Sequence, residues 1–435
     1  MSNKNLSTDS YKGVRDFYPE DMAIQRYIFD TWTKTAESFG FERYDASILE
    51  PSDLYKAKGA ANEEMVNDQT YTFTDRGDRE VTLRPEMTPT VARMVAGRAR
   101  ALSFPLRWYS IPNLFRYERM QKGRLREHWQ LNCDIFGSTD YTADVEMIAL
   151  AYQTLIDFGA KPEMFEVVIN NRQYYTEILL YLANLASKKL SKIQIEEIIR
   201  LSDRINKISG IDFENRLIEI TGEETAANII KLIKGEDFRE IDVPSKQNLT
   251  NVYEGLLQLG FKNIKLNPTL ARGFDYYTGT IFEIFEVDSD GKQTGRSLLG
   301  GGRYDNLTEM FGGEAVPGIG FGMGDVTMRD FLETHKLLPA NLAATSATLV
   351  IIPMEVQQNL AAQKIAKTFR DNDISVFVDF GTKKFGKKIS DAADEGAKYV
   401  IVVGEDEVNS DTYTLKNLTT GESETGSILK LIKAL

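Results

Sequence analysis

Polar and charged side chains alternate with apolar ones along residues 114–137, LFRYERMQKGRLREHWQLNCDIFG. At the two-residue period of a β-strand, Arg116 and Glu118 share one face, and further along Gln130 and Asp134 share one face opposite apolar neighbours. This pattern predicts a β-hairpin with one apolar and one polar face. A face that combines arginine, glutamate, glutamine and aspartate suits a small zwitterion.

The connection of this hairpin is long and basic. It runs from about residue 120 to residue 127, beyond the ~2–5 residues of ordinary hairpin loops, and it carries Lys122, Arg124 and Arg126 around Gly123. Such a loop suits a polyanion. The simpler interpretation is that the polar face is solvated and the charged loop keeps a sheet edge soluble. The rest of the chain has to decide between the two.

Three further segments place polar residues where burial is expected. TLRPEMT, residues 82–88, ends a strand with Glu86 beside a proline, and ARGFDYYTG, residues 271–279, carries Arg272 into another strand. GGGRYD, residues 300–305, lets a ligand approach the backbone closely. A triple glycine is often only a turn, and no Walker or Rossmann nucleotide fingerprint is present.

Length and composition bound the possible classes of protein. The 435 residues suggest roughly two or three domains, and 42% hydrophobic with 27% charged residues is typical of a globular chain. Neither a long apolar run nor an apolar leader is present, so we expect a cytoplasmic protein with no membrane contact. The lone Cys133 and two histidines argue against a disulfide, a zinc site or a Ser-His-Asp triad.

The charge distribution separates one local region from the rest. A net charge of −12 argues against non-specific nucleic-acid binding by the whole surface. Residues 93–126 nevertheless carry nine arginines and lysines against Glu118 alone. Such a patch can hold phosphates with an affinity that falls as salt rises.

Apolar periodicity predicts the order of the elements. A helix is expected over residues 20–39, followed by strands at residues 41–48, 69–74, 80–84 and 106–111, before the hairpin. Residues from about 172 to 260 have helical patterns only, strand patterns then return, and the last segment alternates short buried strands with helices. The fold class is therefore α+β, with an all-α insertion and an appended α/β domain.

Taken in this order, the segments resemble the histidyl-tRNA synthetases, a family of class II aminoacyl-tRNA synthetases, over essentially the whole chain. KGVRDFYP, residues 12–19, resembles the opening motif of that family, and the hairpin resembles class II motif 2. ARGFDYYTGTIFE and GGGRYDNL resemble the two histidine signatures, and residues 386–407 resemble the C-terminal anticodon-binding domain.

This resemblance implies a class II synthetase-like antiparallel sheet with flanking helices. The implied domains are a catalytic core in two parts, residues 1–171 and 263–335, a helical insertion at residues 172–262, and an α/β anticodon-binding domain at residues 345–435. The implied reaction ligates histidine to its tRNA through histidyl-adenylate, with ATP and Mg²⁺ and without zinc or an organic cofactor. The implied partners are L-histidine, ATP, the tRNA for histidine and a second copy in a homodimer, built partly through motif 1 near residues 41–51.

The resemblance also implies roles for individual residues. Arg116 and Arg272 would approach the ATP α-phosphate from opposite sides as the catalytic pair. Adenine and the terminal phosphates would be held by Glu118 and Arg124 beside Arg116. The tRNA acceptor end would be met by Gln121 and Arg126.

For the amino acid, the resemblance implies two sets of contacts. The α-amino group would be held by Glu86, Thr88 and Gln130. The positions around the imidazole are Asp134, Tyr276, Tyr277 and Tyr304. A carboxylate that accepts the ring N–H while a tyrosine meets the other nitrogen selects a two-nitrogen ring, because a wrong substrate would leave a buried partner unsatisfied at ~1–3 kcal/mol.

Two positions depart from the family pattern. Asp134 stands where some relatives have glutamate, and Thr327 stands where the family often places an arginine for the ATP γ-phosphate. Arg329 lies ~200° around a helix from that position, which makes it a poor substitute. Either another cation, with Arg124 as the candidate, holds the ATP, or the helix begins in another register. The loss at Thr327 keeps a second function open, a catalytically inactive histidine-sensing paralogue acting as a regulatory subunit. Such paralogues resemble the catalytic body without the anticodon domain.

Overall fold

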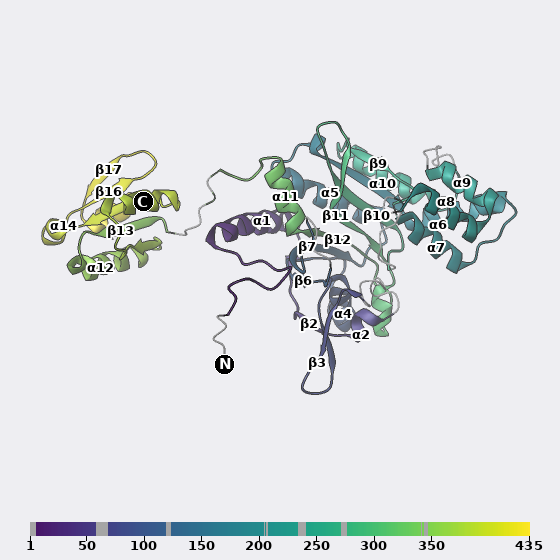
Figure 1. Ribbon diagram of the computed structural model, residues 1–435, viewed down its shortest axis with the longest axis horizontal. Coiled ribbons are helices and arrows are strands. Elements are labelled where there is room, and N and C mark those ends of the chain that lie inside the picture. Colours follow the sequence, from purple (N-terminus) through teal and green to yellow (C-terminus); the bar gives the residue numbers. More distant parts are fainter. Residues whose placement is uncertain are drawn as a thin grey trace. The chain divides into compact units, whose positions relative to one another are not determined.

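A computed structural model of the chain describes residues 6–57, 68–118, 123–203, 205, 208–233, 241–270, 276–340, 342 and 347–435. The chain divides into two compact units. The first comprises Met1–Arg15 with Ile28–Leu337, and the second comprises Asp16–Tyr27 with Leu338–Leu435. Figure 1 shows the elements of both units along the chain.

The first unit is built on a large mixed sheet. In the described part of the chain it has nine strands, in the order β1-β5-β7-β12-β11-β10-β8-β9, with β6 paired to β7. Their bounds are β1 Glu42–Arg43, β5 Leu106–Ser110, β6 Asn113–Phe115, β7 Glu127–Phe136, β8 Phe165–Asn171, β9 Ile264–Leu266, β10 Thr280–Val287, β11 Gln293–Tyr304 and β12 Gly318–Gly324. The central pairs are antiparallel as predicted, whereas β1–β5 and β8–β9 at the two ends are parallel.

Helices cover one face of this sheet. α1 (Pro19–Ser38), α5 (Tyr141–Asp157) and α11 (Asp325–Thr334) lie near β7, β11 and β12 in Figure 1. In α1, Ile28, Trp32 and Ala36 are completely buried, and the Trp32 indole N–H donates to the Met323 sulfur of β12 at 3.0 Å. This face is the apolar one, so the polar residues of β7 point to the opposite side.

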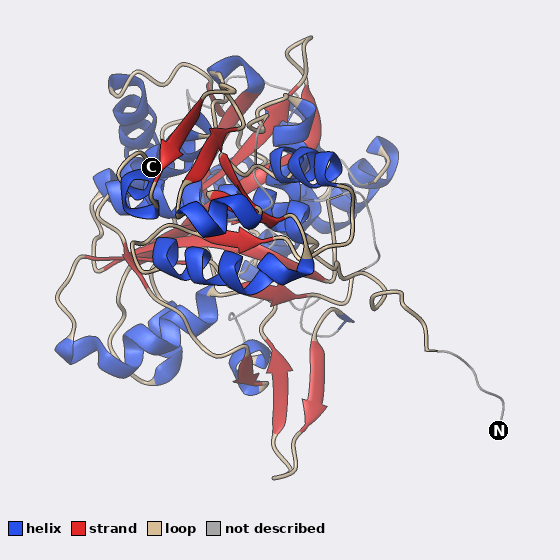
Figure 2. Cartoon of the chain, turned by 90° about the vertical axis from the view of Figure 1, so that its left-hand side faces the viewer, coloured by secondary structure: helices blue, strands red, loops and turns tan. Residues whose placement is uncertain are grey.

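A second, three-stranded sheet contains β2 (Leu49–Pro51), β4 (Glu80–Leu83) and β3 (Tyr71–Thr74), with α2 (Asp53–Lys56) and α4 (Thr88–Arg98) beside it. Its β3–β4 hairpin projects at the bottom of Figure 2. The strand predicted over residues 41–48 is wrong in extent, because only Glu42–Arg43 pairs. The buried Arg84 guanidinium donates to the Ala46 carbonyl at 2.9 Å and to the Asn113 carbonyl at 3.0 Å, which replaces ladder bonds with side-chain bonds.

The region predicted to be all-helical carries α6 (Arg172–Leu185), α7 (Lys192–Asp203), α8 (Gly210–Thr221), α9 (Glu223–Ile233) and α10 (Lys246–Gln258). The first four group together in Figure 1. α10 instead packs on α5, where a Cβ at Gly255 would come within 2.9 Å of the Val145 side chain. The close approach of these two helices therefore depends on a residue without a side chain.

The second unit contains a small α/β domain. Its strands are β13 (Leu349–Pro353), β14 (Val376–Val378), β15 (Tyr399–Val403), β16 (Tyr413–Asn417) and β17 (Ser423–Gly426), and its helices are α12 (Asn359–Arg370), α13 (Phe385–Asp394), α14 (Glu405–Ser410) and α15 (Ile428–Ile432). β14, β13 and β15 are parallel, as the largely parallel prediction required, whereas β16 and β17 extend the sheet in antiparallel fashion.

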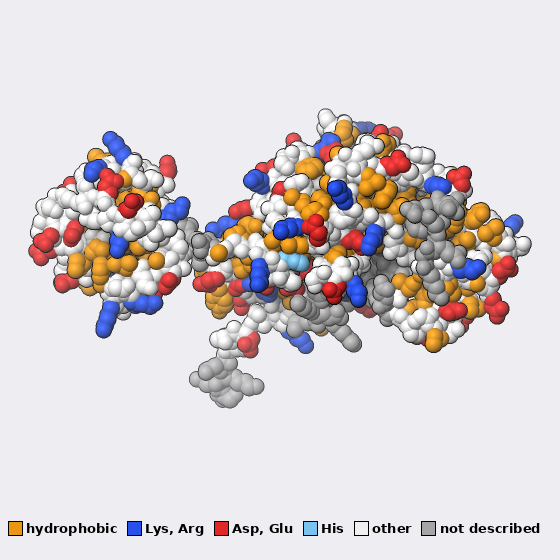
Figure 3. Space-filling model, turned by 90° about the horizontal axis from the view of Figure 1, so that it is seen from above, with side chains coloured by type: hydrophobic (Ala, Val, Ile, Leu, Met, Phe, Trp, Pro, Cys, Tyr) orange, Lys and Arg blue, Asp and Glu red, His pale blue; other side chains and the backbone are white. Residues whose placement is uncertain are grey.

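The surface agrees with a chain of mixed charge. On the face drawn in Figure 3, acidic and basic side chains are interspersed among those in colour, without a continuous patch of one sign. Within the described residues, no helix combines the length and apolar character needed to cross a membrane.

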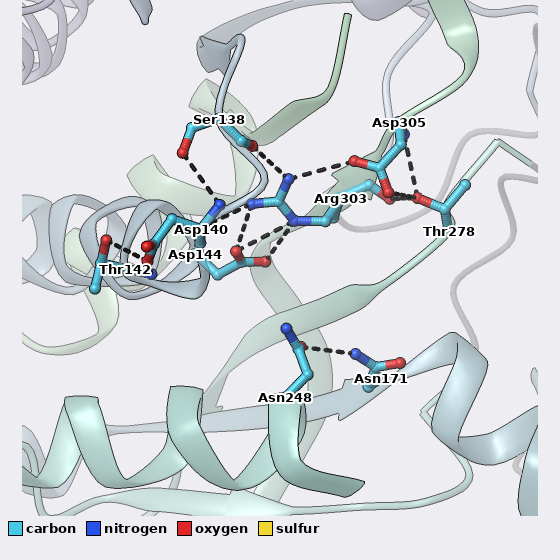
Figure 4. A network of polar contacts seen from close by, with 9 residues as sticks. All are labelled: Ser138, Asp140, Thr142, Asp144, Asn171, Asn248, Thr278, Arg303 and Asp305. Atoms are coloured by element: carbon cyan, nitrogen blue, oxygen red, sulfur yellow. Dashed lines mark hydrogen bonds and ion pairs between the residues drawn. The ribbon is translucent and has the colours of Figure 1, made fainter. Parts of the chain in front are cut away.

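A buried ion-pair network joins α5 to β11 (Figure 4). The Arg303 guanidinium contacts the Asp144 carboxylate through its Nε at 3.1 Å, and its Nη1 donates to the Ser138 carbonyl at 2.8 Å and to Asp305 Oδ1 at 3.3 Å. Thr278 donates to the other oxygen of Asp305 at 2.7 Å. Thr278 and the segment GGGRYD are therefore clamped to each other and to the start of α5.

The clamp can be tested by Asp144→Ala. Since this change leaves a buried guanidinium without its principal carboxylate, we expect the free energy of unfolding of the first unit to fall by about 3–5 kcal/mol. The chain's three tryptophans, Trp32, Trp108 and Trp129, all lie in that unit, so tryptophan fluorescence during urea denaturation measures it alone.

The matched control is Glu146→Ala on the same helix. Glu146 pairs with Arg107 at 2.6 Å, but both side chains are about a third exposed. Its loss should cost no more than about 1 kcal/mol. An equal effect of the two changes would contradict the structural role of the Arg303 network.

Candidate active site

The register of three central strands places the polar residues of β7 and β11 on one face. Asp134 of β7 lies opposite Gly320 of β12, which lies opposite Gly302 of β11. Two positions away, Phe136, Gly318 and Tyr304 form the next row. Because side chains two residues apart share a face, Asp134 and Tyr304 point to the same side of the sheet.

Glycines make the space that these side chains occupy. A Cβ at Gly320 would lie 2.3 Å from Asp134 Oδ1, and one at Gly322 would lie 2.7 Å from the Gln130 side chain. A Cβ at Gly302 would lie 2.7 Å from the Tyr277 ring. The sequence interpretation used only the triple glycine of β11. The glycines of GIGFGMG, alternating at strand period, were the signal that it missed.

Asp134 and Tyr304 form a buried pair. The Tyr304 hydroxyl donates to Asp134 Oδ1, and both residues are almost completely buried. Burial raises the pKa of Asp134 to about 7, while the hydrogen bond from Tyr304 opposes that rise. Burial also raises the pKa of Tyr304 well above its ordinary value. At neutral pH the Asp134 carboxyl group is therefore partly protonated: its ionised form accepts hydrogen bonds, and its protonated form can donate one.

Aromatic rings pack beside this pair. The Tyr276 ring centroid lies 4.8 Å from that of Tyr277 and 5.8 Å from that of Tyr304. The Tyr276 hydroxyl donates to the buried Glu86 carboxylate at 3.1 Å. Glu86 stands just before α4, whose first residue is the half-buried Thr88. Contacts thus link five of the seven predicted histidine-binding residues, namely Glu86, Asp134, Tyr276, Tyr277 and Tyr304. Thr88 stands two residues after Glu86, and Gln130 lies on the same strand as Asp134.

Two cations of the hairpin have different environments. Arg116 follows β6 directly, and its Nε donates to the Pro85 carbonyl, the residue before Glu86, at 2.8 Å. Arg124 Nη1 lies 3.2 Å from Glu118 Oε2, with the Arg124 side chain 59% exposed. One arginine is therefore held beside the segment that carries Glu86, and a second is exposed to solvent in the loop.

Arg126 has a different environment. Its guanidinium lies 3.9 Å from the centroid of the Tyr117 ring, its backbone N–H donates to the Gly13 carbonyl at 2.7 Å, and its stem fills the space where a Gly13 side chain would stand. It anchors the N-terminal segment to the hairpin in this structure. Arg272 and Gln121, the remaining predicted site residues, lie outside the described residues.

The opening motif KGVRDFYP contributes a second buried ion pair. Arg15 donates to Asp325 Oδ2 at 2.6 Å, and the other oxygen of Asp325 accepts the Trp129 backbone N–H at 2.9 Å. Asp325 is completely buried at the start of α11. The N-terminal segment therefore ties β7 to α11, a role that sequence reasoning did not find because it joins residues about 300 positions apart.

Thr327, the position that departs from the family pattern, lies in the first turn of α11. Thr327 Oγ1 donates to the Gly324 carbonyl at 3.1 Å, and Arg329 Nε donates to Glu333 at 2.9 Å along the helix. Within the described residues, no three side chains of histidine, cysteine, aspartate or glutamate are grouped as a metal site would require.

The sequence and the fold of this chain match those of known proteins. The model of the histidyl-tRNA synthetase family matches residues 13–325, more than half of the chain. This chain belongs to the histidyl-tRNA synthetase family. An anticodon-binding domain model matches residues 348–435, so the family member carries both parts.

Relatives and solved structures match this family member over its full length. It is 41% identical to a histidine–tRNA ligase of Leptospira biflexa, covering 100% of this chain and 99% of that protein, and 34% identical to that of Thermoplasma volcanium, covering 99% of both. The crystal structure of histidyl-tRNA synthetase from Nostoc sp. PCC 7120 shares the fold, with a TM-score of 0.76 at 23% identity over 99% of this chain and 100% of that one. Apo S. aureus histidyl-tRNA synthetase gives a TM-score of 0.73 at 26% identity over 98% and 99%.

The buried carboxyl group generates a prediction for Asp134→Asn. Because the folded-state pKa of about 7 exceeds the ordinary 3.8, the folded protein keeps a proton that the unfolded chain releases. The free energy of unfolding of the wild type should therefore fall as pH rises from about 4 to about 7. An asparagine side chain does not titrate in this range. The free energy of unfolding of the variant should therefore rise relative to that of the wild type between about pH 4 and pH 7, and the difference should persist above pH 7.

The measurement is tryptophan-monitored urea denaturation of both proteins at pH 5 and pH 8. Histidine-dependent activity of the same variant should fall about 10-fold or more, because an amide cannot supply a charged acceptor. A stability difference that is the same at both pH values would contradict the raised pKa of Asp134.

Proposed function

We propose that this protein ligates histidine to its tRNA in two steps, through histidyl-adenylate formed from ATP with release of pyrophosphate. The observation that carries the proposal is the match of one chain to both the synthetase family model and the anticodon-binding model. Full-length relatives named histidine–tRNA ligase, at 34–41% identity, support it.

The first step needs position and charge rather than a base. The histidine carboxylate is already ionised at neutral pH. It attacks the α-phosphorus of ATP, a carboxylate oxygen–phosphorus bond forms, and the bond to the pyrophosphate oxygen breaks. Charge develops on the phosphoryl oxygens, so fixed cations accelerate the step. Arg116, held by the Pro85 carbonyl, is one such cation, and Arg272 is proposed as its counterpart on the opposite side.

Histidine recognition is proposed to use the buried face of β7 and β11. Asp134 would accept the imidazole N–H, with its orientation set by the Tyr304 hydroxyl. Tyr276 and Tyr277 would pack beside the ring, while Glu86, Thr88 and Gln130 would hold the α-amino group. Burial raises the pKa of Asp134, which keeps the carboxyl partly protonated in the absence of substrate, and its ionised form would accept a strong hydrogen bond from the ring N–H.

ATP is proposed to lie along the hairpin. Glu118 would meet the adenine, and Arg124, which pairs with it at 3.2 Å, would turn to the terminal phosphates. Thr327 bonds to its own helix turn and supplies no cation there, so the exposed Arg124 is the proposed replacement. Mg²⁺ would supply charge neutralisation to the ATP phosphates, which would be its main ligands.

The second step would pass histidine to a hydroxyl of the terminal tRNA adenosine. Gln121 and Arg126 are proposed at the acceptor end, and residues 345–435 at the anticodon. The catalytic core is proposed to comprise residues 1–171 and 263–335, with residues 172–262 as the insertion. We also infer a cytoplasmic homodimer, supported by the exposed Ile48, Leu49 and Phe73 near motif 1, which a second copy would bury.

One observation favours a second function. A solved structure from Bacillus halodurans, titled as an ATP phosphoribosyltransferase regulatory subunit/histidyl-tRNA synthetase, shares the fold with a TM-score of 0.72 at 22% identity. With Thr327 in place of an arginine, this chain could have lost its ATP site and serve as a histidine-sensing regulatory subunit. The anticodon-domain match weighs against that interpretation.

The deciding experiment is amino-acid-dependent exchange of pyrophosphate into ATP, without tRNA, with each of the twenty amino acids. We expect exchange with histidine alone. Arg116→Ala and Arg272→Ala should each lower the rate about 10²–10³-fold, since each removes a charge aimed at the transition state.

Arg79→Ala is the matched control. This arginine is 78% exposed and pairs with Asp75 in the β3–β4 turn, so its loss should leave exchange unchanged. Histidine binding without exchange in the wild type would overturn the ligase proposal in favour of the regulatory subunit.

A further inference from the structure

One buried side chain ties the turn that leads into the signature ARGFDYYTG to strand β8. Asn170 is almost completely buried near the end of β8, and its Nδ2 donates to the Pro268 carbonyl and to the Leu270 carbonyl, each at 2.9 Å. Carbonyl oxygens only accept hydrogen bonds, so only the NH₂ group of the amide can make both contacts, and they fix which way the amide points. The chain is therefore held at two points immediately before the signature.

The turn is also fixed by bonds of its own. The Asn267 backbone N–H donates to the Ile169 carbonyl of β8 at 3.1 Å, and the Leu270 backbone N–H donates to the Asn267 carbonyl at 3.1 Å. Asn267 Oδ1 accepts the backbone N–H two residues further on at 2.9 Å. These bonds close a turn over residues 267–270, of which Asn170 holds the second and the last residue.

The chain that leaves the signature is tied as well. The Thr278 backbone N–H donates to the Arg303 carbonyl at 2.8 Å, and the Thr278 hydroxyl donates to Asp305 at 2.7 Å (Figure 4). Residues 271–275, which include Arg272, come between these ties and the turn in the sequence, and they lie outside the described residues. The segment that carries the proposed second cation is thus bracketed by fixed chain on both sides.

Asn170 stands on the same face of the sheet as Asp134. Its register partner in β10 is Ile281, which pairs with Gly302 of β11. Gly302 pairs with Gly320 of β12, and Gly320 pairs with Asp134 of β7. Residues of one cross-strand row share a face, so the Asn170 amide lies on the side of the sheet that carries the proposed histidine-binding carboxyl group.

We propose that Asn170 is a positioning residue for Arg272 and acts through the two carbonyls of the turn. Arg272 is two residues beyond Leu270, so the place at which the chain leaves the turn bears on where the guanidinium can reach. Placement matters because a fixed charge must meet the charge that develops in the transition state, and a displacement of ~1 Å can cost ~10²-fold in rate. This inference rests on the proposed function, because it takes Arg272 as a cation at the α-phosphate.

The test is Asn170→Ala in histidine-dependent pyrophosphate exchange. The change removes both N–H donors, which releases the turn from the end of β8. We expect kcat to fall about 10- to 100-fold, because the cation is no longer held where charge develops. The KM for histidine and the KM for ATP should change less than about 3-fold, since Asn170 is proposed to touch neither substrate.

A double variant separates positioning from a general structural role. In an Arg272→Ala background, Asn170→Ala should slow exchange less than about 2-fold further, because the group to be positioned is already absent. Independent effects would instead multiply. A further loss of 10-fold or more in that background would therefore overturn the inference.

Asn263→Ala is the matched control at the other end of β8. Asn263 Nδ2 donates to the Pro162 carbonyl at 2.9 Å and to the Phe165 carbonyl at 2.7 Å, so its loss removes the same two kinds of bond at the first residue of the strand. It should lower thermal stability and leave kcat unchanged. If kcat is equally unchanged in Asn170→Ala, the inference is wrong. Wild-type exchange with histidine would still uphold the proposed function, so the two failures are distinguishable.

If Asn170→Ala fails to fold, Asn170→Asp decides in the same two backgrounds. A carboxyl group has nearly the volume of an amide, and its ionised form has no donor for either carbonyl. The folded fraction of each variant can be checked by tryptophan fluorescence before the kinetic comparison, because the three tryptophans lie in the first unit together with Asn170.

Discussion

The proposed site depends on the placement of a single carboxyl group above a strand of glycines. Asp134 is buried against Gly320, where even a methyl group would collide with its oxygen. The glycines of the adjacent strands thereby leave room for the side chains of Asp134, Gln130 and Tyr277 over the sheet. Burying an unpaired carboxylate is expensive, and the protein meets that cost through partial protonation and the Tyr304 hydroxyl. The tyrosines, the arginines of the hairpin and the surrounding clamps all take their positions relative to this group.

The buried Arg303 and the half-buried Arg15 keep the strands around Asp134 in register, although neither is proposed to touch a substrate. Arg303 links the two histidine signatures to α5 on the opposite side of the sheet, so Tyr304 and Thr278 cannot shift independently. Arg15 links the N-terminal segment to Asp325, and Asp325 in turn holds the backbone of Trp129. These pairs span very long stretches of the chain. They fix the spacing between sequence motifs that lie on different strands of the sheet.

Polarity changes along the proposed path of the two substrates. The proposed histidine site is aromatic and carries two buried carboxyl groups, Glu86 and Asp134, which suits selection of a small ring by hydrogen bonds. The hairpin outside it is cationic, with Arg116 partly buried and Arg124 exposed. The small zwitterion, histidine, would thus meet the aromatic group, and the polyanion, ATP, would meet the cationic hairpin. Arg116 lies between these two regions. The chain's acidic net charge leaves this local cationic region distinct from the rest.

Much of the secondary structure and the polar face of the hairpin could be predicted from the sequence, because both depend on patterns among residues close together in the chain. Strand alternation located Gln130 and Asp134 on a polar face, and helical texture located the insertion, since both depend on residues close together in the chain. The extent of the first strand was not readable, because Arg84 captures the Ala46 carbonyl from a distant segment. The same holds for the Arg15–Asp325 pair and for the raised pKa of Asp134. Each arises from burial and from contacts between residues far apart in the sequence, and only the tertiary structure creates those environments.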